Sequence, residues 1–404
     1  MNTNYDILII GGGAAGFFTA INAATFNTEL KIAILERSKD VLQKVKVSGG
    51  GRCNVTHACF DPKELTQYYP RGAKELLGPF HQFNCGDTFE WFDQRNISLK
   101  IEEDGRVFPE SNTSQTIIDC FINETQKHSI DILKSQGVTD FYKENDNWIV
   151  KTKTEQFTCQ KLVIAAGSSQ KIWKLLEKIN HKVIPPTPSL FTFNINDNRL
   201  QDIPGVVVPN VEIEVLNTKL FSDGPLLITH WGLSAPAVLK ISAWGSKILA
   251  ECNYKFDIQI NFIGYSPQNC REELNTLKKN LAKNNVYKYT QFNLPKRLWY
   301  KLVLAAAITE TTKWADLNKS QLNTLATQLT EAIFKVDGKS TFKEEFVTAG
   351  GVALKEINFK KMESKVHPNL FFAGEVINVD AVTGGFNFQN AWTTGYLVAK
   401  AIGA

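Results

Sequence analysis

The chain has 404 residues, enough for two or three domains, and its 43% hydrophobic and 21% charged residues are an ordinary globular balance. The net charge of +4 is dispersed, so it predicts neither a nucleic-acid nor a membrane partner. No apolar run reaches the roughly 18 residues of a transmembrane helix. The start at Met1–Asp6 lacks the pattern of a secretory signal, so we expect a cytoplasmic protein. The seven cysteines form no Cys-x-x-Cys pair, which predicts no metal site and no disulfide framework.

The chain opens with the pattern of a βαβ unit. An apolar run at 6–10 is typical of a strand buried on both faces, an alanine-rich helix follows at 14–25, and a second strand lies at 31–35. Between the first strand and the helix, residues 11–16 fit G-x-G-x-x-G, whose glycines permit a tight turn, approach of a pyrophosphate and close helix packing. Glu36 is placed to bind a ribose hydroxyl, or else is a surface charge.

The following segments predict the domain organisation. Residues 62–124 look mainly helical, 148–153 and 157–159 alternate like antiparallel strands, and 162–167 is an apolar strand ending at a glycine. The prolines at 185–188 predict a boundary, because proline continues neither a helix nor a strand ladder.

Beyond the prolines, strand-like alternation and two polar-faced helices at 267–284 and 318–335 indicate an inserted domain of strands and helices. We therefore predict an α/β fold in which a Rossmann-type domain is formed by 1–185 and 341–404, with an insertion at 186–340.

Three further segments favour FAD over NAD as the cofactor. The glycine-rich run at 44–54 supplies N–H donors beside Lys46 and Arg52, or else is a flexible surface loop. The apolar strand at 370–375 ends in Gly-Glu, where a carboxylate can bind the hydroxyls of a ribityl chain. Residues 383–387 open the last helix, whose N-terminal amides can stabilise negative charge on the pyrimidine edge of a flavin.

With these motifs the sequence resembles the aminoacetone-oxidase-like flavoproteins, a group of NAD(P)/FAD-dependent oxidoreductases in the glutathione-reductase and fumarate-reductase superfamily. The resemblance implies a β-barrel-like insertion and a small helical cap over the flavin. It departs at His57, where the family usually has Asn, and at Ala235, where Gly usually precedes the proline. It is carried by residues 10–16, 46–56, 105–109, 229–234, 347–352 and 372–395.

From the motifs and the resemblance we expect a set of residues to bind FAD. Lys46, Arg52 and Asn54 are assigned to the flavin face, and Thr348, Gly350 and Gly351 to backbone walls near the ring. The full predicted set is Gly11, Gly12, Gly13, Ala14, Ala15, Gly16, Glu36, Arg37, Lys44, Lys46, Ser48, Gly49, Gly50, Arg52, Cys53, Asn54, Val138, Ala166, Gly167, Thr348, Gly350, Gly351, Gly374, Glu375, Gly384, Gly385, Phe386 and Asn387.

Arg106 and His230 are the predicted substrate-binding and catalytic residues. Arg106 follows a turn and could anchor a carboxylate or carbonyl, or else form a structural ion pair. His230 could act as an acid, a base or a hydrogen-bond donor, or else be a core or interface histidine. Cys53 and Cys59 are separated by five residues, one more than in disulfide reductases, which disfavours a redox-active dithiol.

The predicted function is transfer of a hydride between flavin N5 and a small organic substrate of amine, carbonyl or enone type. Two alternatives remain open: a reductase that takes electrons from transiently bound NAD(P)H, and a flavin-binding sensor without turnover. The predicted partner is a small molecule, without a nucleic acid, a membrane or an obligate protein partner.

Overall fold

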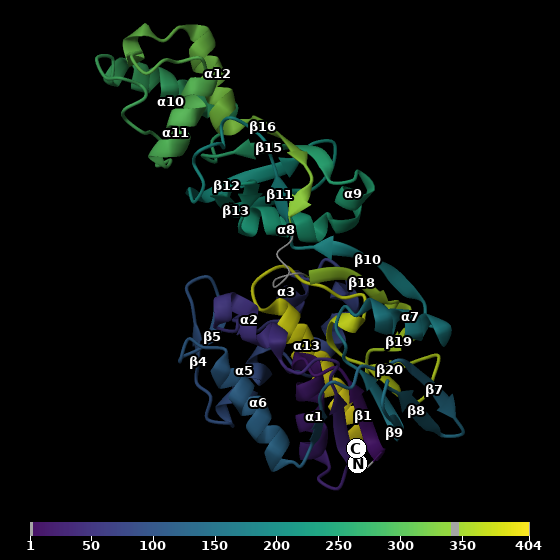
Figure 1. Cartoon of the computed structure of the whole chain (residues 1–404). Helices are drawn as coiled ribbons and strands as arrows, with labels where there is room; N and C mark the ends of the chain where they lie inside the picture. Colours follow the sequence, from purple (N-terminus) through teal and green to yellow (C-terminus); the bar gives the residue numbers. More distant parts are fainter. Residues whose placement is uncertain (1–2, 341–346, 404) are drawn as a thin grey trace. The chain divides into compact units, whose positions relative to one another are not determined.

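The computed structural model describes residues 3–340 and 347–403. The chain divides into two compact units, which we call unit 1 (Met1–Thr187 and Lys343–Ala404) and unit 2 (Pro188–Phe342) (Figure 1). The domain boundaries predicted from the sequence fall after residues 185 and 340. Residues 341–346, with which the predicted third segment begins, lie outside the described residues.

Unit 1 is built on a parallel sheet of five neighbouring strands in the order β6-β2-β1-β9-β21. β1 and the end of β9 are almost continuously apolar, as expected for strands that are covered on both faces. The strands are β1 (Asn4–Ile10), β2 (Ile32–Leu35), β6 (Asp131–Leu133), β9 (Gln156–Ile164) and β21 (Leu370–Phe372).

Two helices from opposite ends of the chain pack tightly together in unit 1: α1 (Ala14–Phe26) and α13 (Phe386–Gly403) (Figure 1). A Cβ atom built on Gly395 of α13 would lie 3.1 Å from Thr19 Oγ1 and 3.2 Å from the Ala15 carbonyl oxygen of α1. Glycine therefore allows the two helices to approach closely at this point. This contact joins the C-terminal segment to the first βαβ unit, so unit 1 is made from both ends of the chain.

The other helices of unit 1 surround an aromatic core. Phe18 of α1 lies 4.7 Å from Trp91 and 5.2 Å from Trp392, measured between ring centroids. The helices are α2 (Gln43–Gly51), α3 (Pro62–Thr66), α4 (Ala73–Phe80), α5 (Cys85–Asp93), α6 (Gln115–Lys127) and α7 (Gln170–Lys178).

The region predicted to be mainly helical also contains a small sheet in the order β3-β5-β4. Its strands are β3 (Thr56–His57), β5 (Arg106–Pro109) and β4 (Leu99–Ile101). They are too short to give a period-two pattern. β7 (Asp140–Glu144) and β8 (Asn147–Lys151) extend the main sheet beside β9, and β19 (Ile357–Asn358) and β20 (Glu363–Ser364) extend it beside β21.

One strand prediction in unit 1 was wrong in detail, and so was the physical reason given for a boundary at the prolines, although the division itself falls there, after Thr187. The segments 157–159 and 162–167, predicted as separate strands, lie largely within the single strand β9. Its first half pairs with β8 and its second half pairs with β21. The prolines at 185–188 lie within β10 (Val183–Ser189), which pairs with β18 (Val347–Val352) in a two-stranded sheet. Proline is tolerated there because an edge strand leaves one row of N–H groups unused.

Unit 2 contains a seven-stranded sheet in the order β16-β15-β12-β13-β14-β11-β17. Only Gly338 separates β16 from β17, so the first and last strands of this order meet in the chain. Gly338 also donates to the Tyr254 carbonyl at 2.8 Å and accepts from the Asn194 N–H at 3.0 Å. The sheet therefore curls back on itself, which confirms the expected barrel-like insertion.

The strands of this sheet are β11 (Thr192–Asn194), β12 (Val207–Val215), β13 (Phe221–Ile228), β14 (Gly232–Ser234), β15 (Lys255–Asn261), β16 (Ala332–Asp337) and β17 (Lys339–Ser340).

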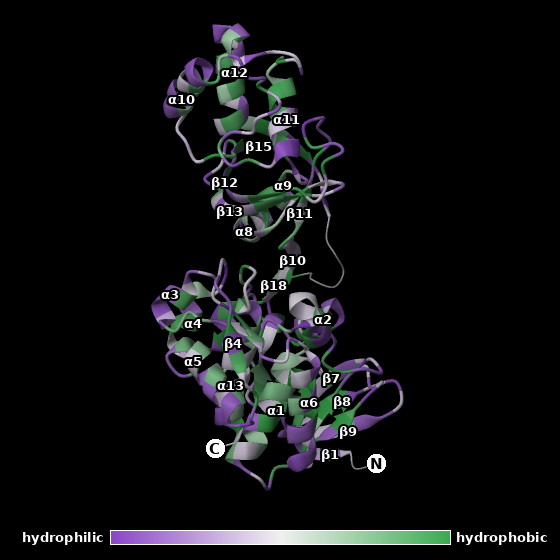
Figure 2. Cartoon of the chain, turned by 90° about the vertical axis from the view of Figure 1, so that its left-hand side faces the viewer, coloured by the Kyte–Doolittle hydropathy of each residue, from purple (hydrophilic) through white to green (hydrophobic). Residues whose placement is uncertain are grey.

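Unit 2 also contains helices. α10 (Pro267–Asn280), α11 (Lys296–Ala305) and α12 (Lys319–Thr330) lie together in both views (Figures 1 and 2), while α8 (Pro236–Trp244) packs on the sheet and α9 (Ser246–Glu251) follows it. The helix predicted to reach residue 335 ends at Thr330, because β16 alternates buried and exposed side chains.

None of the helices in residues 3–340 and 347–403 combines the length and the apolar character that crossing a membrane requires.

Ala235, which precedes α8, has φ 81° and ψ 175°, a conformation that favours glycine. We expect Ala235→Gly to raise the free energy of unfolding by about 1 kcal/mol by removing this strain. Ala237→Gly, inside α8, should lower it by about 1 kcal/mol, since glycine weakens a helix interior. Urea unfolding curves measure both variants. A loss of stability in Ala235→Gly equal to that in Ala237→Gly would contradict the left-handed conformation.

Candidate functional site

The candidate site of unit 1 starts where three parallel strands end. β1, β9 and β21 are neighbours in the sheet, and their last residues are Ile10, Ile164 and Phe372. The chain leaves β1 into the glycine turn and leaves β9 and β21 into Ala165–Gly167 and Ala373–Glu375. In open α/β sheets, ligands bind in the crevice outside these carboxyl ends, at the point where the strand order reverses.

The glycine turn at 11–16 has the geometry of a dinucleotide-binding turn. Gly11 has φ 121°, and a Cβ there would lie 2.4 Å from the Ala165 carbonyl oxygen. A Cβ on Gly16 would lie 2.0 Å from the Gly11 carbonyl oxygen, so glycine lets α1 pack against the turn. A Cβ on Gly13 would contact nothing within 4 Å. Gly13 therefore leaves an open approach to the α1 N-terminus, where the backbone N–H groups of Ala14 and Ala15 can face phosphate.

Glu36, just after β2, is held in place by the same turn. Its Oε2 accepts from the Gly12 N–H at 2.9 Å, and its Oε1 accepts from the Ser38 N–H at 2.8 Å and the Ser38 hydroxyl at 2.6 Å. An ionised carboxylate has about four acceptor positions, so one remains for a ribose hydroxyl. Glu36 is thus both part of the turn and oriented for the predicted contact.

The second glycine-rich run is not a plain loop. It forms the end of α2, where Ser48, Gly49 and Gly50 leave the helical conformation. Gly50 and Gly51 have positive φ angles of 69° and 85°, and a Cβ on either would contact nothing within 4 Å. The left-handed backbone explains glycine at these two positions, and the open space beside them leaves their backbone accessible to a ligand.

An ion pair joins this run to the end of β21. Lys44 Nζ lies 2.5 Å from Glu375 Oε2. A Cβ on Gly167 would lie 3.8 Å from the same oxygen, which places the end of β9 beside the pair. Gly374 donates its N–H to Thr394 Oγ1 of α13 at 2.9 Å. Segments 44, 167, 374–375 and 394 thus meet at one edge of the sheet, as the FAD interpretation requires.

The start of α13 is tied to β3 by Asn54. The Asn54 amide nitrogen faces the carbonyl oxygens of Thr56 at 3.0 Å and Val107 at 3.3 Å, and its side-chain oxygen accepts from the Gly385 N–H at 3.0 Å. A Cβ on Gly385 would lie 2.3 Å from the Thr56 carbonyl oxygen, which explains the glycine. Asn54, predicted at the flavin face, therefore has a structural role in joining the two motifs.

Three aromatic side chains form what we call the His57 stack: His57, Phe386 and Tyr68. The centroid of Phe386 lies 4.6 Å from His57 and 4.1 Å from Tyr68, and both pairs are stacked. His57 Nε2 lies 3.2 Å from the Asp104 carbonyl oxygen, whereas its buried Nδ1 has no hydrogen-bond partner among the described residues. Burial lowers the pKa of His57 and raises that of the Tyr68 hydroxyl, so we expect a neutral imidazole and a protonated phenol at pH 7.

Sequence reasoning noted His57 only as a departure from the family pattern and missed Tyr68. His57 and Tyr68 lie 5.7 Å apart between ring centroids, but both stack on Phe386, which lies more than three hundred positions further along the chain. No local sequence pattern contains that contact.

Two of the three predicted arginines of unit 1, Arg52 and Arg106, are paired with carboxylates. Arg106 lies 2.7 Å from Asp104 and 3.2 Å from Glu102, which is the structural ion pair that the sequence left open as the alternative. Arg52 lies 2.6 Å from Glu102, and its guanidinium is 3.8 Å from the centroid of Phe108. The substrate role of Arg106 and the flavin contact of Arg52 stay predictions.

His230 lies in unit 2 and is exposed, between β13 and β14. The alternative interpretation as a core histidine was therefore wrong, and its catalytic role stays a prediction.

Burial raises the pKa of Cys53 to about 12 and that of Cys59 to about 11. Little thiolate would form at pH 7, which agrees with the rejection of a redox-active dithiol.

The remaining predicted positions differ in their surroundings. Gly350 and Gly351 face protein backbone, since a Cβ on each would lie 2.8 Å from Pro186 Cα and 2.5 Å from the Val376 carbonyl oxygen, respectively. Asn387 bonds both polar groups of Ala381 at 3.0 and 3.2 Å. Arg37 and Lys46 are exposed, Val138 and Thr348 are buried, and Ala166 is partly buried.

The glycine turn gives a direct test of dinucleotide binding. Gly13→Ala should fold with an unchanged melting temperature as the apoprotein, because its methyl group meets open space and its φ of −98° suits alanine. Its FAD affinity should fall at least about tenfold, since the methyl group blocks the pyrophosphate. Gly16→Ala should instead lose stability, by at least about 1–3 kcal/mol, through overpacking. Circular dichroism and FAD titration separate the two effects; FAD affinity equal to wild type in Gly13→Ala would place the pyrophosphate elsewhere.

Comparison with known proteins agrees with this geometry. The family profile described as "HI0933-like protein Rossmann domain" matches residues 5–401. The ribosomal RNA dihydrouridine synthase of Escherichia coli (strain K12) is 29% identical over 98% of this chain and 97% of its own. The 3-dehydro-bile acid delta(4,6)-reductase of Clostridium scindens is 24% identical over 97% of this chain and 98% of its own.

Among solved structures, 3-ketosteroid delta1-dehydrogenase from Sterolibacterium denitrificans shares the fold over 100% of both chains, with a TM-score of 0.53 and 12% identity. The narrower resemblance to aminoacetone oxidases stays a prediction. The family profile covers nearly the whole chain, and the predicted Rossmann-type fold and FAD cofactor are confirmed. The protein belongs to the HI0933-like Rossmann family and is an FAD-dependent oxidoreductase.

Proposed function

We propose that this flavoprotein reduces the C5–C6 double bond of a uridine in ribosomal RNA, which yields dihydrouridine. The observation that carries the proposal is the correspondence with the Escherichia coli dihydrouridine synthase, which extends over 98% of this chain and 97% of that enzyme. A match of this length includes the sequence of both units. The bile-acid reductase is less similar, at 24% identity, so we place RNA first and a small enone second.

Both relatives act on the same kind of chemical group, judged by their names. The C5–C6 double bond of uracil is conjugated with the C4 carbonyl, and a delta(4,6) double-bond system in a 3-oxo steroid is conjugated with the C3 carbonyl. Bound FAD supplies or accepts the hydride at N5. The chain must then orient the unsaturated ring, exclude water and stabilise charge on the carbonyl oxygen. It must also deliver one proton to the carbon next to the carbonyl, which is C5 in uracil, while the hydride is added to C6.

We assign the proton delivery to Tyr68. Its hydroxyl carries a proton at neutral pH, as a phenol ordinarily does, and burial raises its pKa further, while stacking on Phe386 fixes its ring. Gly384 and Gly385, predicted to face the flavin, adjoin the same stack, since a Cβ on Gly384 would lie 3.6 Å from His57 Cδ2. A positioned proton donor of this type contributes typically about 10²–10⁴-fold to a rate.

We assign substrate orientation to His57. If Nε2–H donates to the Asp104 carbonyl oxygen, Nδ1 carries the lone pair and can accept a hydrogen bond. Nδ1 is buried without a partner among the described residues, and burial of an unpaired polar atom is unfavourable. The N3–H group of uracil, which a steroid lacks, is a donor that would satisfy it once the groups that cover Nδ1 move aside.

A single-turnover reaction tests the proposed function without requiring the natural electron donor. The FAD-loaded protein is reduced with dithionite without oxygen and mixed with unmodified ribosomal RNA made by transcription in vitro. We expect the flavin to be reoxidised and dihydrouridine to appear in the digested RNA by mass spectrometry, as a mass gain of about two hydrogens. Reoxidation by a 3-oxo-4-ene steroid, with none by RNA, would overturn the proposal in favour of the predicted small-molecule substrate.

Tyr68→Phe tests the proton donor. This variant keeps the aromatic stack, so FAD content should stay at the wild-type level, while the single-turnover rate should fall about 10²–10⁴-fold. Tyr142→Phe, on β7, is the matched control and should react at the wild-type rate. A wild-type rate in Tyr68→Phe would remove Tyr68 from the mechanism.

A further inference from the structure

The positive charge of this protein is concentrated in one segment, so the expectation that it is dispersed was wrong. We call residues 267–330, which include α10, α11 and α12, the helical cluster. It contains ten Lys or Arg residues against four Asp or Glu, a net charge of +6, while the whole chain carries +4. The rest of the protein is therefore slightly acidic, and the modest overall charge conceals a strongly basic part.

The basic side chains of the helical cluster are available to a partner. Seven of them are exposed, and none forms an ion pair among the residues that the structure describes. In unit 1, by contrast, Arg52, Arg95 and Arg106 are all paired with carboxylates. The seven are Lys279, Lys283, Lys288, Lys296, Arg297, Lys313 and Lys319.

A hollow beside the end of α10 adds an aromatic surface to this charge. It has a volume of about 490 Å³ and is lined by Leu277, Asn280, Leu281, Lys288, Tyr289, Thr290 and Gln291. Tyr289 is 53% exposed, so its ring is accessible at the hollow. A base can stack on such a ring, the amides of Asn280 and Gln291 can bond its edge, and Lys288 can contact its phosphate.

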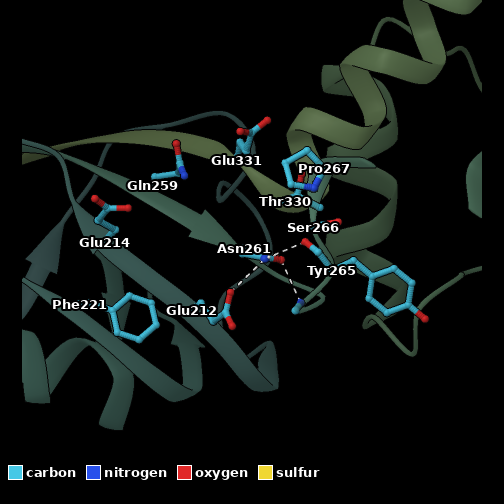
Figure 3. A pocket seen from close by; sticks show the side chains of 11 residues that line it. Glu212, Glu214, Phe221, Gln259, Asn261, Tyr265, Ser266, Pro267, Thr330 and Glu331 are labelled. Carbon is cyan, nitrogen blue, oxygen red and sulfur yellow. Dashed lines mark hydrogen bonds between the residues drawn. The ribbon is translucent and has the colours of Figure 1, made fainter. Parts of the chain in front are cut away.

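A second hollow of unit 2 has the opposite character. Figure 3 shows it at the side of the sheet, where Glu212, Glu214 and Glu331 are among the residues that line it. Asn261 there donates to Glu212 at 3.1 Å. The carboxylates of this acidic hollow would repel a phosphate backbone. RNA is therefore expected at the hollow beside α10, which contains Lys288, and not at this one.

We propose that the helical cluster is an RNA-docking surface, in which Lys283 and Lys288 contact phosphates of single-stranded RNA and Tyr289 stacks on a base. This inference rests on the proposed function for the identity of the nucleic acid. Its own evidence is the charge, the exposed ring and the hollow. Docking of this kind holds the substrate strand through its backbone and leaves the choice of nucleotide to the flavin site.

Fluorescence anisotropy with a labelled single-stranded ribosomal RNA segment, at several salt concentrations, tests the surface. The double variant Lys283→Glu, Lys288→Glu should weaken binding at least about tenfold and lower the slope of log affinity against log salt by about 1.4, because each lost phosphate contact contributes about 0.7. Tyr289→Ala should weaken binding about tenfold and leave the slope unchanged, since stacking does not release counterions.

The control is Lys174→Glu, Lys178→Glu on α7, which changes the net charge equally and should bind RNA like the wild type. Equal weakening in the control would show a general charge effect and overturn the proposal. So would wild-type binding in the test variant, or Lys288-dependent binding to vesicles of phosphatidylglycerol without binding to RNA.

The single-turnover reaction separates this proposal from the proposed function. Dihydrouridine formation by the wild type, with unaltered RNA binding in the test variant, would reject the docking surface alone. RNA binding that depends on Lys288 and Tyr289, without dihydrouridine formation, would support the surface and reject the uridine-reducing function.

Discussion

Close approach of backbone to backbone at the carboxyl edge of the parallel sheet is the constraint on which unit 1 depends. α1 can begin where it does only because Gly16 lacks a Cβ against the Gly11 carbonyl oxygen, and the absence of a Cβ on Gly395 lets α13 pack closely on α1. These contacts fix the start of the chain to its end. They also set the N-terminus of α1, the end of α2 and the loop at 374–375 around one edge of the sheet, so the cofactor site is a product of packing.

The site combines saturated polar groups with a few unsatisfied ones. Glu36, Asn54 and Asn387 use most of their hydrogen-bonding capacity on the protein itself, which makes the cradle rigid before a ligand arrives. His57 Nδ1 is different, because it is buried without a partner in the described part of the chain. A buried polar group left in this state is costly to stability, so the free lone pair of Nδ1 is better explained by a ligand than by folding.

Much of this architecture could be predicted, because the first βαβ unit has strong local periodicity and glycine turn chemistry. The failures have physical causes. β9 was divided in two because its partners change from β8 to β21 along its length, and the prolines of β10 are permitted only by their position at an edge. The predicted helix at 318–335 ran too far because Ala332, Phe334 and Val336 alternate with exposed residues only over a short stretch.

The glycines of the site could be predicted from the sequence, whereas the contacts between its side chains could not. The Lys44–Glu375 pair and the His57 stack depend on contacts between distant segments, which no local pattern contains. The charge of the helical cluster was different, since it was visible in the sequence but was averaged away when the whole chain was counted together. Counting by segment would have revealed it.

The closing of the unit 2 sheet through Gly338 determines where its two ends lie. β11, near the start of the unit, pairs antiparallel with β17, near its end, and Thr192 is opposite Ser340. The chain therefore enters and leaves the inserted unit at neighbouring points. Inserting such a unit into a Rossmann domain costs little loop-closure entropy, because the folded unit already holds its two ends close together. In evolution, a unit of this kind can be gained, lost or exchanged as a cassette while the nucleotide-binding host keeps its fold.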